Sequence, residues 1–176
     1  MIEDGERFQT FLFTDAGAIP NHPRFPLIWW RGALPADPGP EAFESLFTRH
    51  GWGQTWRNGI FTYPHFHSTS HEVLGIARGS VRVRLGGTTG VEVDLQGGDV
   101  VLIPAGVGHQ NLHASADLLV VGAYPPDANV DLLRDATGDA ALRRRIAALP
   151  APPSDPVEGR PGRVAAIWAS ALQGTA

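Results

Sequence analysis

Apolar and polar residues alternate in short segments through the central part of the chain, and Gly, Ser, Thr and Pro separate these segments. In the clearest case, residues 81–95, aliphatic side chains alternate with charged ones on both sides of a glycine-rich loop. This alternation predicts a β-hairpin with one aliphatic face and one charged face. A symmetric hairpin pairs Arg84 with Glu92 and Arg82 with Asp94, and each such exposed pair contributes about 0.2–1 kcal/mol.

Four further apolar runs are rich in residues that favour strands, and Pro, Gly or polar residues bound each of them. They are residues 7–14, 27–30, 99–103 and 118–124. Several short strands at this spacing are typical of a sandwich or a barrel. The 21 Gly and 15 Pro residues supply the turns that such a fold needs. We therefore predict a mostly β fold.

One segment has helical rather than alternating spacing. Pro40 and two early glutamates stand at its start, Phe43, Leu46 and Phe47 follow at helical intervals, and two basic residues and Gly51 close it. Proline and acidic residues favour the start of a helix, and basic residues followed by glycine favour its end. We predict an amphipathic helix between Pro40 and Gly51 that packs on a sheet.

The pattern changes again after residue 125. Residues 131–149 combine apolar residues at helical spacing with three consecutive arginines, which predicts a second short helix. Residues 150–162 hold five prolines and should form an extended strap over the surface. The last apolar piece, residues 164–169 with Trp168, predicts an edge strand or an anchor.

Composition and charge exclude several classes of chemistry. The chain has 176 residues, with 14 Lys+Arg against 18 Asp+Glu and a net charge of −4, which argues against nucleic acid or an anionic membrane as a partner. It has no cysteine, so disulfides, thiolate nucleophiles and cysteine zinc sites are excluded. His, Asp and Glu must carry the chemistry.

The length fits a single domain, residues 1–176. We place its barrel core at about residues 55–125, flanked by N-terminal strands and a helix (1–54) and by a C-terminal helix and proline-rich strap (126–176). The acidic first six residues, and the lack of an apolar run of about 18 residues, predict a cytoplasmic protein.

Two segments carry the densest candidate chemistry. His65 and His67 are two positions apart, so both imidazoles face the same side if the segment is a strand. Glu72 opens the next predicted strand after a polar turn, and an antiparallel return would bring its carboxylate beside the imidazoles. His109 follows a turn rich in Pro and Gly further along the chain. These residues could form a metal site.

The first segment resembles the first motif of the cupin superfamily. Gly59 is followed after five residues by His65-x-His67, after four more by Glu72, and after six more by Gly79. The second segment is similar to the second cupin motif. It has Gly98, five residues, Pro104-x-Gly106, two residues and His109.

The longer sequence segments around Trp56, His67 and Ile103 resemble those of the YjlB-type cupins, a bacterial family whose members are largely uncharacterised. One position departs from the superfamily pattern, because His113 stands where the second motif usually closes with Asn, and the chain has Asn111 instead. This departure puts the strand register or the pocket floor beyond the metal site in question.

The resemblance implies a double-stranded β-helix, also called a jelly-roll barrel, with one or two short flanking helices. It also implies one divalent metal ion bound by His65, His67, Glu72 and His109. Nitrogen and oxygen ligands without a thiolate suit Fe, Mn, Ni, Co or Zn, and the sequence does not choose among them. The family resemblance further implies a homodimer paired by sheet edges, and the N-terminal strands or the Trp168 segment could supply the contact.

Three functions remain open at this level. The first is a metal enzyme, oxygenase-like, that acts on an organic acid, enol or phenol. The second is a metal-dependent isomerase or epimerase, and the third is a barrel that binds a small ligand without catalysis. The expected partner is a small, anionic molecule. Glu72 could act as a general base. Phe61 and Tyr63 share the side of the histidines and could line the substrate pocket or pack in the core.

The other candidate residues have simpler interpretations. His71 precedes an inward-facing Glu72, so we expect it at the rim rather than on the metal. His22 and His50 have no partner in sequence and are expected at the surface. Arg57 could steer an anion or cap the edge of the sheet, and we favour the cap.

Overall fold

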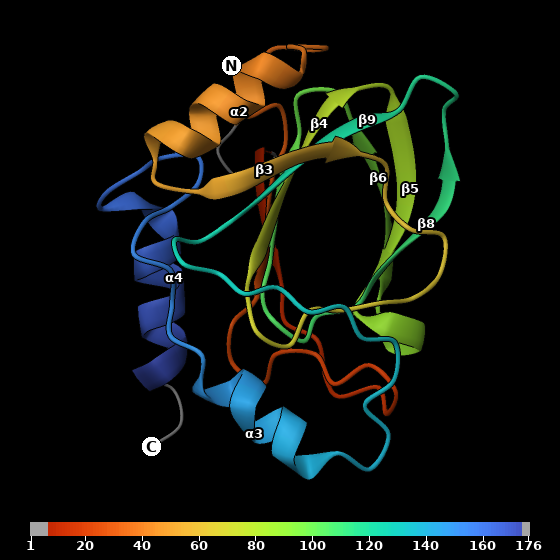
Figure 1. Ribbon diagram of the computed structural model, residues 1–176, viewed down its shortest axis with the longest axis vertical. Coiled ribbons are helices and arrows are strands. Elements are labelled where there is room, and N and C mark those ends of the chain that lie inside the picture. The colour runs from red at the N-terminus through yellow and green to blue at the C-terminus, as the bar shows by residue number, and fades with distance from the viewer. Residues whose placement is uncertain (1–6, 174–176) are drawn as a thin grey trace.

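The computed structural model describes residues 7–173, so the acidic residues 1–6, used above to predict location, lie outside it. Two antiparallel sheets make up the barrel. The larger has the strand order β1-β2-β7-β4-β9-β3, and the smaller has the order β6-β5-β8. Figure 1 shows the two sheets facing each other, with α2 and α4 flanking the same side of the barrel.

The strands are β1 (Phe8–Phe11), β2 (Leu27–Trp30), β3 (Gly53–Asn58), β4 (Glu72–Arg78), β5 (Ser80–Leu85), β6 (Val91–Gln96), β7 (Val100–Ile103), β8 (His109–Ala114) and β9 (Leu119–Tyr124). The helices are α2 (Pro40–Arg49), α3 (Ala140–Ala148) and α4 (Gly162–Gln173), with a 3-10 turn at Gly87–Thr89. Within the described part of the chain, no helix is both long and apolar enough to cross a membrane.

The mostly β, jelly-roll prediction is confirmed, and the hairpin register is confirmed in detail. Arg84 lies opposite Glu92 and Arg82 lies opposite Asp94. Both pairs form ion pairs at the surface, at 2.7 and 2.8 Å. The register follows from the alternation, which puts the aliphatic residues of both strands on one face, together with a loop that joins the strands symmetrically.

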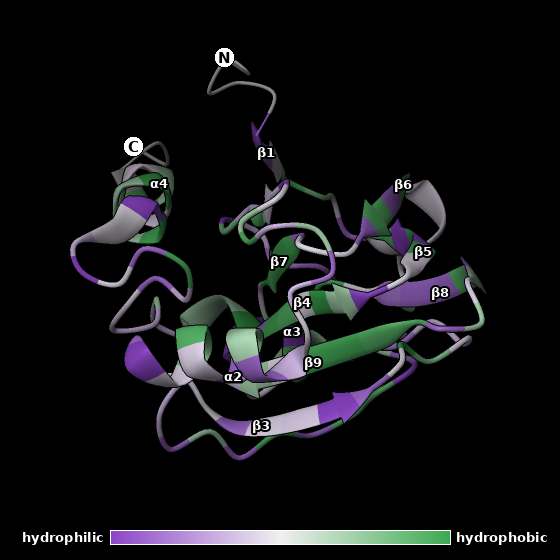
Figure 2. Ribbon diagram, turned by 90° about the horizontal axis from the view of Figure 1, so that it is seen from above, coloured by the Kyte–Doolittle hydropathy of each residue, from purple (hydrophilic) through white to green (hydrophobic). Residues whose placement is uncertain are grey.

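Strand β4 has two apolar faces, and each meets a different layer. Val73 belongs to the cluster that packs under α2, whereas Leu74 and Ile76 belong to the cluster inside the barrel. In Figure 2, which is coloured by hydropathy, β4 and β9 are largely apolar, whereas β3 is mostly polar. Because side chains alternate along a strand, Glu72 shares the inward parity of Leu74 and points into the barrel.

Helix α2 begins and ends where the sequence predicts. Pro40 is its first residue, and Phe43, Leu46 and Phe47 are buried against the outer face of the large sheet. Gly75 of β4 permits this contact, since a Cβ there would lie 2.5 Å from the Phe43 ring. The predicted helix is therefore confirmed, and its packing depends on a glycine in the strand beneath it.

Helix α3 is shorter than the predicted 131–149, because it begins only at Ala140. Asp139 caps it by accepting a hydrogen bond from the Leu142 backbone N–H at 2.8 Å. The preceding residues instead form loops, and the Asp131 carboxylate binds Ser68 in the segment that carries the histidines. Tertiary contacts of Asp131 thus compete with the helical periodicity.

The C-terminal segment forms a helix, so the edge-strand alternative is wrong, and within residues 7–173 the flanking helices are α2, α3 and α4. Val164 and Trp168 are both buried and lie four residues apart, which is helical spacing. The buried Asp155 carboxylate binds the Val164 N–H at 3.2 Å, near the start of α4. Trp168 is fully buried, so it anchors α4 and is not exposed for contact with a second subunit. The homodimer itself stays a prediction.

His22 is fully buried, so the prediction that it lies at the surface is wrong. Its Nδ1 accepts hydrogen bonds from the backbone N–H groups of Arg24 and Phe25, at 3.2 and 2.8 Å. Its ring stacks on Phe25 with a centroid separation of 4.4 Å. Two backbone donors thus find their acceptor in this imidazole, which no periodic pattern in the sequence signals.

His22 should make the protein sensitive to acid. Burial, aided by the charges of His71 and Arg24, lowers the pKa of His22 from 6.5 to about 3. As the pH falls below 6.5, the unfolded chain binds a proton at His22 that the folded chain refuses until about pH 3. The free energy of unfolding therefore falls by about 1 kcal/mol per pH unit in this window.

The variant His22→Asn should lose this part of the pH dependence, because an asparagine oxygen can accept the same two N–H groups without titrating. Urea denaturation at pH 6.5, 5.5 and 4.5 measures the difference. Both proteins keep all other histidines, so the comparison isolates His22. Parallel stability curves for the two proteins would contradict the expectation.

Candidate metal centre

Two of the four predicted ligands begin strands, and two lie in the segment between β3 and β4. His109 is the first residue of β8, and Glu72 is the first residue of β4. His65 and His67 lie outside the named strands, contrary to the strand assumed from sequence. His65 nevertheless exchanges both backbone hydrogen bonds with His109, at 2.9 and 3.2 Å, and the Gly106 N–H binds the His67 carbonyl at 2.7 Å. A short bridge therefore replaces the strand.

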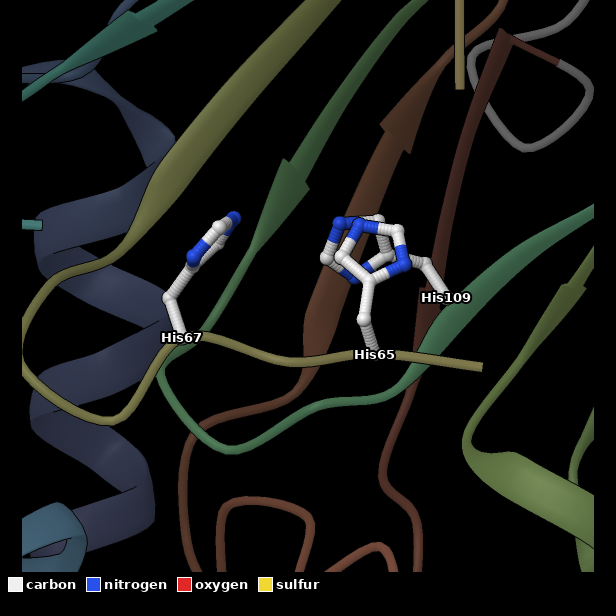
Figure 3. Close-up of side chains that lie close together, drawn as sticks. All are labelled: His65, His67 and His109. Carbon is white, nitrogen blue, oxygen red and sulfur yellow. The ribbon is translucent and has the colours of Figure 1, made fainter. Parts of the chain in front are cut away.

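The structure brings the four side chains together. One possible ligand atom from each of His65, His67 and His109 lies within 4.8 Å of the others. Oε2 of Glu72 lies 3.1 Å from Nε2 of His67 and 3.3 Å from Nε2 of His109. All four residues are buried. Figure 3 shows the three imidazole rings on the same side of the backbone that carries them.

Backbone carbonyls fix the orientation of all three imidazoles. Nδ1 of His65 faces the carbonyl of Tyr63 at 3.1 Å, and Nδ1 of His109 faces that of Val107 at 3.2 Å. Nδ1 of His67 faces the Asp131 carbonyl. A carbonyl only accepts, so each Nδ1 carries the hydrogen and each neutral ring has its lone pair on Nε2. This is the usual arrangement that prepares a histidine to bind a metal.

The charges in the site are strongly coupled. Burial, together with the charge of His109, lowers the pKa of His65 to about 3. Burial alone would lower the pKa of His67, but its hydrogen bond and ion pair with Glu72 prevail and raise it. Burial alone would raise the pKa of Glu72, yet the hydrogen bonds of His109 and His67 hold it well below the ordinary value. Glu72 is therefore ionised.

The Glu72 carboxylate and the two imidazoles beside it, those of His67 and His109, are short of hydrogen-bond donors. Because each Nδ1 hydrogen faces a carbonyl, a neutral ring presents only a lone pair from Nε2 to the Glu72 carboxylate, which lies 3.1 and 3.3 Å from Nε2 of His67 and His109, so a hydrogen bond there needs a second proton on the ring. Buried acceptors in such an arrangement need a cation between them, either a proton on an imidazole or a metal ion. Three imidazoles and one carboxylate form a donor set suited to a divalent transition metal. The residues present thus fit the metal that the sequence implies.

Sequence reasoning missed Asp131. Its carbonyl orients His67, and its carboxylate accepts hydrogen bonds from the Ser68 N–H at 2.7 Å and from the Ser68 hydroxyl at 2.5 Å. One residue therefore fixes both the imidazole and the turn that follows it. No local signal marks this role, because Asp131 lies 64 positions beyond His67.

Tyr124 was also missed. It follows Ala123, the β9 partner of Val73, so it shares the inward parity of Glu72 and lines the same cavity as that carboxylate. The indole N–H of Trp56 donates to the Tyr124 oxygen at 3.0 Å, which leaves the Tyr124 hydrogen for Glu72. Burial and the Glu72 charge raise the pKa of Tyr124. The alternation of β9 ending at Tyr124 is a signal that could have identified it.

The four candidate ligands, His65, His67, Glu72 and His109, line a cavity of about 220 Å³. Phe61 lines this cavity and is 46% exposed. Tyr63 is absent from the lining formed by residues 7–173, and it stacks on Phe61 with ring centroids 4.9 Å apart. The guanidinium of Arg134 covers the Tyr63 ring at 4.2 Å. Of the two predicted pocket residues, Phe61 lines the cavity, and Tyr63 packs against the ring of Phe61.

The remaining candidate residues, His71, Arg57 and His50, form hydrogen bonds or ion pairs with other parts of the fold. His71 is buried rather than at the rim, and it accepts a hydrogen bond from the Ala105 N–H at 3.0 Å while its other nitrogen binds the Pro150 carbonyl at 2.9 Å. Arg57 pairs with two glutamates of α2, in line with the cap that we favoured. His50 is half-buried and binds the carbonyl of Pro156.

The position that departs from the cupin pattern lies away from the metal centre. His113 is exposed on β8, opposite Arg82 of β5. The register shifts between Arg82 and Val83, whose partners are His113 and Asn111, so one extra residue of β8 bulges there. The sequence departure thus coincides with a change of register beyond the ligands.

No family model matches the chain. The chain resembles an acireductone dioxygenase from Bacillus anthracis, solved with cadmium in its active centre, at 17% identity over 52% of this chain and 62% of that one, with a TM-score of 0.37. It also resembles a DUF861 family protein from Thermotoga maritima, at 22% identity over 54% of this chain and 94% of that one, with a TM-score of 0.32.

A much stronger similarity is to the uncharacterized protein YjlB of Bacillus subtilis (strain 168). The two are 41% identical over 163 residues, which cover 91% of this chain and 96% of the relative. With this identity over nearly its whole length, the chain, a jelly-roll barrel, belongs to the YjlB family.

Proposed function

We propose that this protein is a mononuclear divalent-metal enzyme that acts on a small organic acid, enol or phenol. The observation that carries the proposal is the convergence of imidazole lone pairs on the ionised Glu72 while every Nδ1 hydrogen is committed to a backbone carbonyl. One dication held by His65, His67, Glu72 and His109 would satisfy these acceptors together. Fe, Mn, Ni, Co and Zn all suit this set.

Such a metal would polarise an oxygen atom of a bound substrate, and a redox-active one would also support oxygenase chemistry. Side chains of the protein supply the general base and the groups that orient it. Glu72 is the proposed general base when it swings off the metal, since its carboxylate lies in the cavity and is ionised. Tyr124 orients that carboxylate, and its own position is fixed by Trp56.

Replacing Glu72 with Gln tests the proposed base. Glutamine keeps the size of the side chain but cannot take up a proton, so we expect turnover to fall at least about 100-fold at equal metal content. Oxygen uptake by the Fe(II)-loaded protein, measured over a panel of organic acids, enols and phenols, gives the rate. Undiminished turnover at equal metal content would remove Glu72 from the mechanism.

The same measurements separate the alternatives. Turnover with a redox-inert metal and no oxygen uptake would favour a metal-dependent isomerase or epimerase. Ligand binding that a chelator leaves unchanged would favour a binding barrel without catalysis.

A further inference from the structure

The two ends of the cavity differ in chemistry. The candidate ligands and Glu72 are buried, whereas Phe61 and Leu132, which line the same cavity, are 46% and 41% exposed. The metal-ligand candidates therefore lie at the inner end, and Phe61 and Leu132 lie at the opening together with the exposed Asn58. Ile60 and Leu74 add further apolar wall. The described residues include four large, exposed hydrophobic side chains, and two of them stand at this opening.

The cavity also lacks cationic side chains. No arginine contributes to its lining among residues 7–173, and the chain contains no lysine. Arg57, on the neighbouring strand β3, is held by two glutamates of α2. A divalent metal and the ionised Glu72 would together carry a net charge of about +1. The metal and Glu72 can thus neutralise one negative charge on a ligand, and the described residues that line the cavity include no arginine or lysine for a second.

Size limits the ligand further. The volume of about 220 Å³ is smaller than the roughly 300–1,000 Å³ of pockets that hold drug-sized molecules. A second anionic group would lie against Phe61 and Leu132, whose side chains offer it neither a charge nor a hydrogen-bond donor. This argues against nucleotide sugars, phosphate esters and dicarboxylates as ligands.

Resting on the proposed function, we infer that the cavity selects small monoanions with an apolar, ring-sized body. The anionic, chelating head faces the metal centre, and the body lies against Ile60, Leu74, Phe61 and Leu132. Exposed apolar residues that line a cavity commonly mark the place where a ligand completes the surface.

Three probes with one chelating head test this inference. Mandelate, lactate and malate are all 2-hydroxycarboxylates, and they differ in carrying a phenyl ring, a methyl group or a second carboxylate. Isothermal titration calorimetry on the metal-loaded protein should find mandelate at least about tenfold tighter than lactate, since burial of a ring contributes this much. Malate should bind no more tightly than lactate.

Matched variants locate the effect. Leu132→Ser should reduce the preference for mandelate over lactate to about threefold or less, because the ring loses its contact at the opening. Leu12→Ser removes a leucine that is 60% exposed and does not line the cavity, so it should leave the preference unchanged.

Metal content, measured on each sample, separates the possible failures. Equal affinity for mandelate and lactate, or tightest binding of malate, at full metal occupancy would overturn the inferred ligand class and leave the metal site standing. A protein that takes up no metal would overturn the proposed function and this inference together.

Discussion

Replacing His109 with alanine will empty the metal centre. The wild-type protein, purified without a histidine tag, should contain about one divalent metal ion per chain by mass spectrometry, and the variant should contain almost none. Loss of a group that merely orients a ligand already lowers metal affinity about 10- to 100-fold. Loss of His109 removes a ligand itself and also the partner of Glu72 at 3.3 Å, so the decrease should exceed 100-fold.

The exposed His113 provides a matched control on the same strand. It lies four residues beyond His109 on β8 and faces solvent, so His113→Ala should retain the metal. His65→Ala should behave like the His109 variant, because the two residues belong to one cluster. Metal retained equally in all three variants would refute the ligand assignment, as would a wild-type protein that binds none after reconstitution.

The identity of the metal then directs the search for a reaction. Iron or manganese would favour oxygen-dependent chemistry, whereas zinc would favour proton transfer or binding. A tag must be avoided, because it carries nickel into the site during purification.

The sequence predicts well those parts of the fold in which each residue is governed by its neighbours. The alternation in residues 81–95 determines the register of the hairpin, and Pro40 and Phe43 show where α2 begins and which face it buries. The cupin resemblance brings together residues as distant as His65 and His109, which no local pattern does.

The features that sequence missed depend on contacts between distant segments. Asp131 has an ordinary loop composition around it, and only the folded chain places its carbonyl against His67. His22 lacks a signal for the same reason, because its role is to accept two backbone N–H groups in a buried turn. Residues 164–169 are apolar enough for either a strand or a helix, and the longer spacing from Val164 to Trp168 decides between them.

Trp168→Ala should cause the largest loss of stability of any substitution in the C-terminal segment. Trp168 is fully buried, stacks on Phe25 at 4.4 Å and meets the edge of His71 at 4.9 Å. Its indole N–H donates to the Pro26 carbonyl at 3.0 Å. Truncation leaves a cavity and an unpaired carbonyl, and we expect the free energy of unfolding to fall by about 3–5 kcal/mol.

Guanidinium denaturation of the metal-saturated protein measures this loss, and two variants interpret it. Leu172→Ala changes an exposed residue of the same helix and should cost less than about 0.5 kcal/mol. Trp168→Phe keeps a ring against Phe25 but loses the hydrogen bond to Pro26, so its effect should lie between the other two. Equal stability of Trp168→Ala and Leu172→Ala would mean that α4 is not anchored by this side chain. A loss of the expected size would show that Trp168 holds α4 against the barrel through Phe25, His71 and the Pro26 carbonyl.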